Sequence, residues 1–394
     1  MNAASRASPA GCAPLGLAVA LGLLLQTTAL AAPVVSGPPE RVFDWEQARC
    51  AKWDIPDAPA RAWRGADGRV HLIAGSDQSR LSTGATLDKL ERDCDVVHAG
   101  AEADDPAAYD DRAWIAAVFT QDGVRIEALA HVEYHGHLRP ERCAAGQYAR
   151  CWRNAVVAVV SSDGGESFSA TAPGAGTVAV LPYRYDGEKS GREGYFNPSN
   201  ILRHGNHLYA FVFAEALDAQ RRGPCLLRRP VAGGSRDWRA WDGRGFTRVF
   251  ADPYRTDLTD PGRHTCVPVK GIGSTVSSVV RHLPSGDFLA VTPSTRPGSD
   301  GAPQSGIYWM RSTDLVHWSE PALLVELPLL WRRDCAAPAA YAYPSLLDGD
   351  SGSRNFDTVD ADFWLYLVEM RIGPDCRIGP DRDLLRLPVT WPAR

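Results

Sequence analysis

Three glutamates in this sequence end strongly apolar segments, where a carboxylate is costly to place. Glu133, Glu215 and Glu369 close the segments EALAHVE, LYAFVFAE and LYLVE. A carboxylate at the end of such a segment must be paired, hydrogen-bonded or exposed in a cleft. A salt bridge or a solvated strand end explains any one of them. Their recurrence at equivalent positions favours a shared functional site.

Paired carboxyl groups are the chemistry of glycoside hydrolysis. An inverting enzyme holds the two groups roughly 6.5–9.5 Å apart, and a retaining enzyme holds them about 5–5.5 Å apart. His131 and His135 flank Glu133 and could bind substrate hydroxyls or place a cation beside that carboxylate. A solvated histidine pair is the alternative. We found no G-x-S-x-G, H-E-x-x-H or P-loop motif that would indicate a different reaction.

The segments that must position these residues are short and β-like. After the N-terminal leader, runs rich in Val, Ile, Phe, Tyr and Trp alternate with Gly, Asp, Pro and Asn turns, which is typical of strands joined by hairpins. Five hairpin units recur, at residues 57–76, 111–136, 197–216, 274–294 and 342–370. Asp67-Gly68, Asp122-Gly123 and Gly205-Asn206 supply the positive φ that tight hairpins require.

A third strand with a polar turn follows several hairpins. Ser161, Asp163, Gly165 and Phe168 form S-x-D-x-G-x-x-aromatic, and 312–318 contains the related S-x-D-x-x-x-W. Asp and Ser side chains can close such turns through backbone amides. We therefore assign these motifs to the fold and not to the chemistry.

With these units and turns the sequence resembles the five-bladed propeller glycosidases of the arabinanase, xylosidase and invertase type. The turn at 161–168 is similar to the Asp box of sialidases. The resemblance implies an all-β, five-bladed β-propeller, with N-terminal residues 41–45 adding a strand beside LLRLPVTW. Sialidases would need six blades, an arginine triad and a nucleophilic tyrosine, and no stretch near Arg61 gives their usual arginine motif.

In a propeller, the starts of first strands and the ends of second strands converge on one face. The resemblance gives the base to an Asp at the first inner strand, which is Asp57; Ala58 stands where the family more often has proline. Glu133 and Glu215 are the candidate acids by position. Other polar residues at these strand ends are expected to bind substrate: His131, His135, Asn197, Asn200, Tyr343, Glu369 and Arg371.

The N-terminus and the cysteines indicate export. Residues 1–32 combine an apolar run with a small-residue cleavage site, which is typical of a signal peptide, and residues 41–394 then form one propeller domain. Eight cysteines remain, an even number that predicts disulfides in a secreted or periplasmic protein. Their spacing favours sequential pairs, with Cys143–Cys151 the first choice.

The composition of the chain limits the classes of binding partner that we expect. The net charge is −5 without a basic stripe, which argues against nucleic acid, and no later segment is long enough to span a membrane. No pattern implies a metal or another cofactor. We expect a monomer that cleaves an oligo- or polysaccharide. A non-catalytic propeller that binds a glycan or protein and a sialidase-like enzyme are the alternatives.

Overall fold

The computed structural model describes residues 32–391 except 145, 171–175 and 189–190. The predicted signal peptide lies outside the described residues except for residue 32. Apart from the single turn of α1 (Trp45–Ala48) and short 3₁₀ segments, the regular structure consists of strands. The all-β prediction is confirmed. No helix within the described ranges is long and apolar enough to cross a bilayer.

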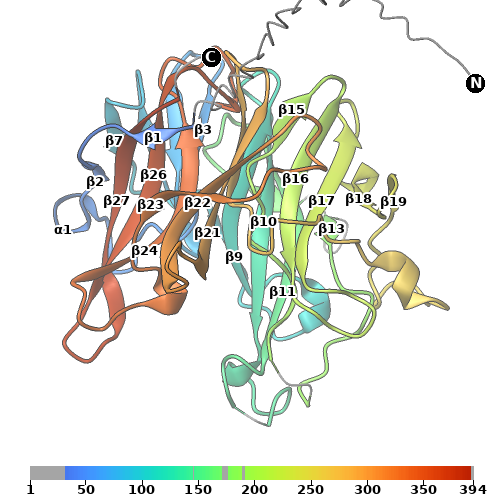
Figure 1. Cartoon of the computed structure of the whole chain (residues 1–394). Coiled ribbons are helices and arrows are strands. Elements are labelled where there is room, and N and C mark those ends of the chain that lie inside the picture. Colours follow the sequence, from blue (N-terminus) through green and yellow to red (C-terminus); the bar gives the residue numbers. More distant parts are fainter. Residues whose placement is uncertain (1–31, 145, 171–175, 189–190, 392–394) are drawn as a thin grey trace, which may run out of the picture.

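The strands form five antiparallel meanders, each built from one stretch of chain and joined by neighbour-to-neighbour pairing (Figure 1). Meander 1 contains β3 (Arg61–Arg64), β4 (Val70–Ile73), β6 (Leu81–Gly84) and β7 (Leu90–Arg92). Meander 2 contains β9 (Arg112–Thr120), β10 (Ile126–His135), β11 (Trp152–Ser161), β12 (Ser169–Ala170) and β13 (Thr177–Ala179). Meander 3 contains β15 (Leu202–His204), β16 (His207–Ala214), β17 (Gly223–Pro230), β18 (Arg239–Trp241) and β19 (Phe246–Arg248).

Meander 4 contains β20 (Ser278–His282), β21 (Phe288–Pro297), β22 (Pro303–Ser312) and β23 (Ala322–Glu326). Meander 5 contains β24 (Ala339–Leu347), β26 (Asp362–Ile372) and β27 (Ile378–Thr390). Short strands connect or extend the meanders: β5 (Gln78–Ser79) pairs with β8 (His98–Ala99), β14 (Glu193–Phe196) joins meanders 2 and 3, and β25 (Thr358–Val359) pairs with β20.

The two ends of the chain meet in meander 5. β1 (Val34–Val35) and β2 (Glu40–Phe43) both pair with β27, so the blue N-terminal strands in Figure 1 lie beside the red C-terminal ones. Val34 lies opposite Thr390, and Arg41 lies opposite Leu385. The prediction that residues 41–45 extend the last hairpin is confirmed.

The predicted hairpins are present, but the bounds of their first strands differ from the prediction. The predicted units begin at 57, 111, 197, 274 and 342, whereas the first strands begin at 61, 112, 202, 278 and 339. Prolines explain part of the difference, because Pro56, Pro59 and Pro198 have no N–H to give to a ladder. Gly68 and Gly123 have φ of 81° and 80° in their turns, as tight hairpins require.

Arg61 lies where the first strands of the meanders approach one another. Its guanidinium is buried, and its five N–H groups reach five acceptors. The acceptors lie in or directly before the five meanders: the carbonyls of Ala60 (3.3 Å), Ala116 (2.7 Å), Pro198 (3.3 Å) and Ser277 (2.7 Å), and the hydroxyl of Ser345 (3.2 Å). One side chain therefore ties the first strands of all five meanders together.

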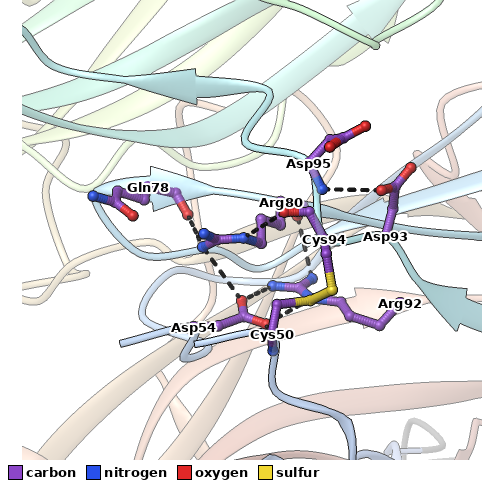
Figure 2. The surroundings of a disulfide bond; sticks show 8 residues. All are labelled: Cys50, Asp54, Gln78, Arg80, Arg92, Asp93, Cys94 and Asp95. Carbon is purple, nitrogen blue, oxygen red and sulfur yellow. Dashed lines mark hydrogen bonds and ion pairs between the residues drawn. A yellow bond between two sulfur atoms is a disulfide. The ribbon is translucent and has the colours of Figure 1, made fainter. Parts of the chain in front are cut away.

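The four predicted sequential disulfides are present: Cys50–Cys94, Cys143–Cys151, Cys225–Cys266 and Cys335–Cys376. Figure 2 shows the first of them beside the buried carboxylate of Asp54, which is 1% exposed. That carboxylate accepts hydrogen bonds from the Cys50 backbone N–H (3.0 Å) and from both Arg92 Nε (3.2 Å) and Nη2. The disulfide and the Asp54 ion pair fix the segment that leads to Asp57.

The polar turns close their hairpins in the expected way. Ser161 Oγ donates to Asp163 Oδ1 (2.6 Å) and accepts from the Gly165 N–H (2.8 Å). The aromatic residue that ends the motif, Phe168, is buried and packs edge-on against Trp63 with the ring centroids 6.4 Å apart. These residues stabilise the fold, as the motif predicts.

Candidate active site

Two neighbouring cavities open where the first strands begin. We call one the carboxylate cavity, because Asp57 and Glu133 line it, and its volume is about 290 Å³. We call the other the arginine cavity, because Arg192, Arg222 and Arg332 line it, and its volume is about 410 Å³. The two cavities share a wall made of Pro59, Arg192, Phe196, Asn197, Leu330, Trp331 and Tyr343.

Asp57 stands in the segment before β3, and two donors hold its carboxylate. Its backbone N–H bonds to the Ala74 carbonyl at 3.1 Å. Its Oδ1 accepts hydrogen bonds from Tyr343 Oη at 3.1 Å and from the Arg382 guanidinium. Burial and the Glu133 carboxylate raise the pKa of Asp57 above its ordinary value, and they outweigh the opposing effects of Arg382 and Tyr343. Both carboxylates line the carboxylate cavity.

Glu133 lies on the same face of β10 as two histidines, because alternate residues of a strand point to one side. Its Oε2 is 2.8 Å from His135 Nε2 and 3.4 Å from Tyr148 Oη, and its Oε1 is 3.9 Å from His131 Nε2. His131 Nε2 is 2.8 Å from Asn154 Oδ1, and burial lowers the pKa of His131. A neutral His131 can therefore donate to Asn154 while Glu133 faces the cavity.

A loop closed by a disulfide places an aromatic side chain over Glu133. Cys143–Cys151 closes the loop between β10 and β11, and Tyr148 lies inside it. The Tyr148 ring stacks on Trp152 with the centroids 4.8 Å apart. Burial and the Glu133 carboxylate raise the pKa of Tyr148, so its phenol stays protonated and can donate to that carboxylate.

Aromatic rings and unused donors complete the carboxylate cavity. Arg192 lies over the rings of Trp152 (5.1 Å), Phe196 (5.3 Å) and Trp331 (5.6 Å). Within the described residues, the buried Nε1–H groups of Trp114 and Trp152 and the Nε–H of Arg112 have no hydrogen-bond partner. Rings beside spare donors suit a ligand with an apolar ring face and several hydroxyls.

Two residues of the shared wall have unusual backbone conformations. Asn197 has φ 48° and Tyr343 has φ 57°, in the left-handed region that non-glycine residues rarely adopt. Each precedes a proline, and at Tyr343 the pairing of β24 with β26 shifts register. Strained backbone of this kind concentrates at functional sites, where the surrounding structure holds it.

The structure does not bring Glu215 to Asp57 and Glu133. Arg192 Nη2 (2.7 Å) and Arg222 Nε (2.8 Å) bind its two carboxylate oxygens, and it lines neither cavity. Its position fits the salt bridge that was the alternative for each of the three glutamates.

Of the predicted binding residues, four line the carboxylate cavity: His131, His135, Asn197 and Tyr343. The other three line neither cavity. Asn200 bonds to both the N–H and the carbonyl of Val279, each at 2.7 Å, which ties meander 3 to meander 4. Glu369 accepts from Tyr341 Oη at 2.8 Å and lies 3.7 Å from Arg371.

Sequence reasoning missed several lining residues: Arg112, Trp114, Tyr148, Trp152, Arg192, Arg222, Trp331, Arg332 and Arg382. Most come from loops or from the later strands of a meander, where no periodic pattern marks them. Among the described residues no three His, Cys, Asp or Glu side chains gather as a metal site would require.

The sequence matches no protein-family model and no curated protein. Among solved structures, the chain is similar to an α-L-arabinanase of Cellvibrio cellulosa in complex with arabinohexaose, with 11% identity, a TM-score of 0.45 and coverage of 84% of this chain and 90% of that one. It is also similar to an endo-arabinase of Bacteroides thetaiotaomicron, with 11% identity, a TM-score of 0.45 and coverage of 91% and 97%. A mutant of the GH43 protein BlXynB of Bacillus licheniformis has 14% identity and a TM-score of 0.46, with coverage of 89% and 54%.

Proposed function

We propose that this protein is a glycoside hydrolase-like enzyme that cleaves a glycosidic bond of an oligo- or polysaccharide between Asp57 and Glu133. One observation carries the proposal. Asp57 precedes meander 1 and Glu133 lies in meander 2, and both line one cavity with aromatic walls. Two carboxyl groups facing one ligand site are what most glycosidases use.

In this proposal Asp57 acts as the base or the nucleophile. Tyr343 and Arg382 both donate to its Oδ1, so Oδ2 is the atom left for water or for the sugar. The raised pKa of Asp57 makes its ionised form a stronger base than an ordinary aspartate. Glu133 is the acid: in the protonated form that this role requires, it gives a proton to the leaving oxygen, and His135 and Tyr148 contact its Oε2.

The neutral parts of the cavity would bind the sugar itself. Trp114, Trp152 and the exposed Trp331 line the cavity and would give the sugar apolar contacts. His131, Asn197 and Tyr343 are near enough to the carboxylates to contact hydroxyls on either side of the scissile bond. Glu215 is then a partner of two arginines and not the acid.

We also propose that the five meanders are the blades of one closed five-bladed propeller in residues 41–394. The five hydrogen bonds of Arg61, one to each meander, support a common axis. The pairing of β2 with β27 supports closure of the ring. With the leader and four disulfides, this fits a protein exported to the periplasm or the medium.

The alternatives differ from this proposal in what the site does. A non-catalytic propeller would use the same rings and donors to hold a glycan without cleaving it. A sialidase-like enzyme would use Tyr343, which bonds to Asp57, as its nucleophile. Burial and Asp57 raise the pKa of Tyr343 far above 10, whereas a nucleophilic phenol needs a lowered pKa.

The test is hydrolysis of a panel of plant and microbial polysaccharides and aryl-glycosides, followed by product analysis. Asp57→Asn and Glu133→Gln should each lower kcat by about 10²–10⁴-fold on an active substrate, since each removes one proton-transfer group. Glu91→Gln, at an exposed position of β7 outside both cavities, is the matched control and should keep the wild-type rate. Glycan binding without any cleavage would leave the binding alternative, and wild-type rates in both variants would place the chemistry elsewhere.

A further inference from the structure

The arginine cavity carries an excess of positive charge. Arg192, Arg222 and Arg332 line it, and no carboxylate does. Glu215 compensates only part of this charge, because it pairs with both Arg192 and Arg222. Arg332 forms no ion pair with any described residue. The cavity therefore has three guanidinium groups against one carboxylate.

Arg61 adds a fourth cation behind the cavity wall. It donates to the carbonyl of Ser277 at 2.7 Å, and Ser277 lines the arginine cavity together with Pro59. All its acceptors are neutral oxygens, and burial lowers its pKa to about 9, so it remains charged at neutral pH. A buried charge without a counter-ion favours an anion in the nearest open space.

The remaining lining is suited to a sugar. The polar residues Ser274, Thr275, Ser294 and Thr295 line the cavity, and Trp331, which also lines it, is 66% exposed. Trp331 also lines the carboxylate cavity, as do Asn197 and Tyr343. One oligosaccharide can therefore reach both cavities, with one unit at the carboxylates and its neighbour among the arginines.

We propose that the arginine cavity binds an anionic group of the glycan, so that the substrate is an acidic carbohydrate bearing a uronate carboxylate or a sulfate ester next to the cleaved bond. Guanidinium groups bind both anions through charge-assisted hydrogen bonds. The inference rests on the proposed function for its link to catalysis, but the binding claim stands by itself.

The experiment measures binding by calorimetry, with Glu133→Gln as the background to prevent turnover. The probes are trigalacturonate, triglucuronate, a sulfated galactotriose, and the neutral methyl esters and unsulfated form of the same sugars. At least one acidic probe should bind about tenfold tighter than its neutral counterpart, the gain typical of one charge-assisted contact. The advantage should shrink as salt increases. Comparison of the affinities for the uronate and the sulfated probes distinguishes the two anions.

Variants test which arginines cause the preference for acidic probes. Arg332→Gln and Arg222→Gln should each remove most of the preference for the acidic probe, and Arg332→Lys should retain part of it. Arg281→Gln makes the same charge change outside both cavities and should leave binding unchanged. Equal affinity for acidic and neutral probes, or no binding of any acidic probe, overturns the proposal. If an acidic probe binds but the wild-type enzyme never cleaves it, the hydrolase proposal is contradicted and the anion site is not. If only neutral glycans are cleaved, the anion site is contradicted and the hydrolase proposal is not.

Discussion

Asp57 lies among groups that move its pKa in opposite directions. Burial and Glu133 raise the pKa, whereas Arg382 and the Tyr343 hydroxyl lower it. The resemblance to propeller glycosidases pointed to Asp57, which precedes the first inner strand. Arg382 could not be predicted, since it comes from β27, 325 residues later, where nothing in the local sequence marks a site.

The first prediction concerns Arg382 as a positioning residue. Replacing Arg382 by Gln removes a positive charge beside Asp57, so the pKa of Asp57 should rise further. A base works only when deprotonated, so the acid limb of the kcat/KM profile should move to higher pH. The measurement is the pH dependence of kcat/KM for wild type, Arg382→Gln and Arg382→Lys.

Arg382→Lys keeps the charge and should restore most of the wild-type profile. If the limb of Arg382→Gln stays where it is in wild type while kcat falls, Arg382 acts through structure and Asp57 is not the base. A second control is Tyr343→Phe, which removes a neutral donor and should shift the limb in the same direction but by less.

At the scale of elements, the loop between β10 and β11 shows how a disulfide can serve a site. The Cys143–Cys151 bridge spans only 8 residues, so its loop-closure contribution is about 2.5 kcal/mol, against ~4 kcal/mol for a loop of 41 residues such as Cys225–Cys266. Its larger effect should be on the position of Tyr148 beside Glu133.

The second prediction follows. The double variant Cys143→Ser/Cys151→Ser should lower kcat/KM by roughly 10- to 100-fold, the cost typical of a misplaced active-site group, while its unfolding free energy falls only modestly. Cys225→Ser/Cys266→Ser should lower the unfolding free energy more and change kcat/KM little. Activity and urea unfolding of both variants are compared at one temperature where both remain folded. A stability loss without an activity loss in the first variant would contradict this role for the loop.

The third prediction concerns the segment before Asp57. Asp54 is buried and paired with Arg92, whose side chain is only 11% exposed, so Asp54→Asn leaves a largely buried guanidinium without its partner and should cost about 3–5 kcal/mol of unfolding free energy. Urea denaturation measures this. The double variant Asp54→Asn/Arg92→Met removes both charges and should recover part of the loss, whereas equal losses in both variants would show that the pair itself is not the cause.

The hairpins, their turns, the disulfide pairs and the N-terminal strand on β27 could all be predicted, because each depends on local spacing or on strand pattern. The candidate site could be predicted only in part. Strand-end position brought Asp57, Glu133 and Tyr343 to one cavity, but it cannot say where a side chain points, and Glu215 turns to two arginines. Residues such as Tyr148 and Arg192 lie in loops without periodicity, so only the folded chain places them.

For the whole molecule, the histidines determine how stability depends on pH. Burial lowers the pKa of His71, His98, His131, His137 and His282 below the ordinary 6.5. Below pH 6.5 the unfolded chain therefore binds protons that the folded chain does not, and protonation favours unfolding.

The fourth prediction is that the unfolding free energy falls as the pH is lowered from 7.5 through 6.5 to 5.5. Urea titrations at these pH values measure the slope. His131→Gln should reduce the slope by the share of one histidine, and His204→Gln, at an exposed histidine, is the matched control and should leave the slope unchanged. A stability that increases over this range would contradict the assignment of neutral, buried histidines.

The five hydrogen bonds of Arg61 also affect when the fold can close during synthesis. Arg61 is made early during synthesis, whereas its acceptor Ser345 follows 284 residues later. Until that residue has emerged, the guanidinium cannot complete its set of partners, and the first strands lack the group that holds them in register with one another. The order of synthesis thus delays closure to the end of the chain, where β27 also receives the N-terminal strands. Under the proposed export, such a chain would cross a membrane before its last contacts form, and it would acquire its final shape only on the side where its disulfides can form.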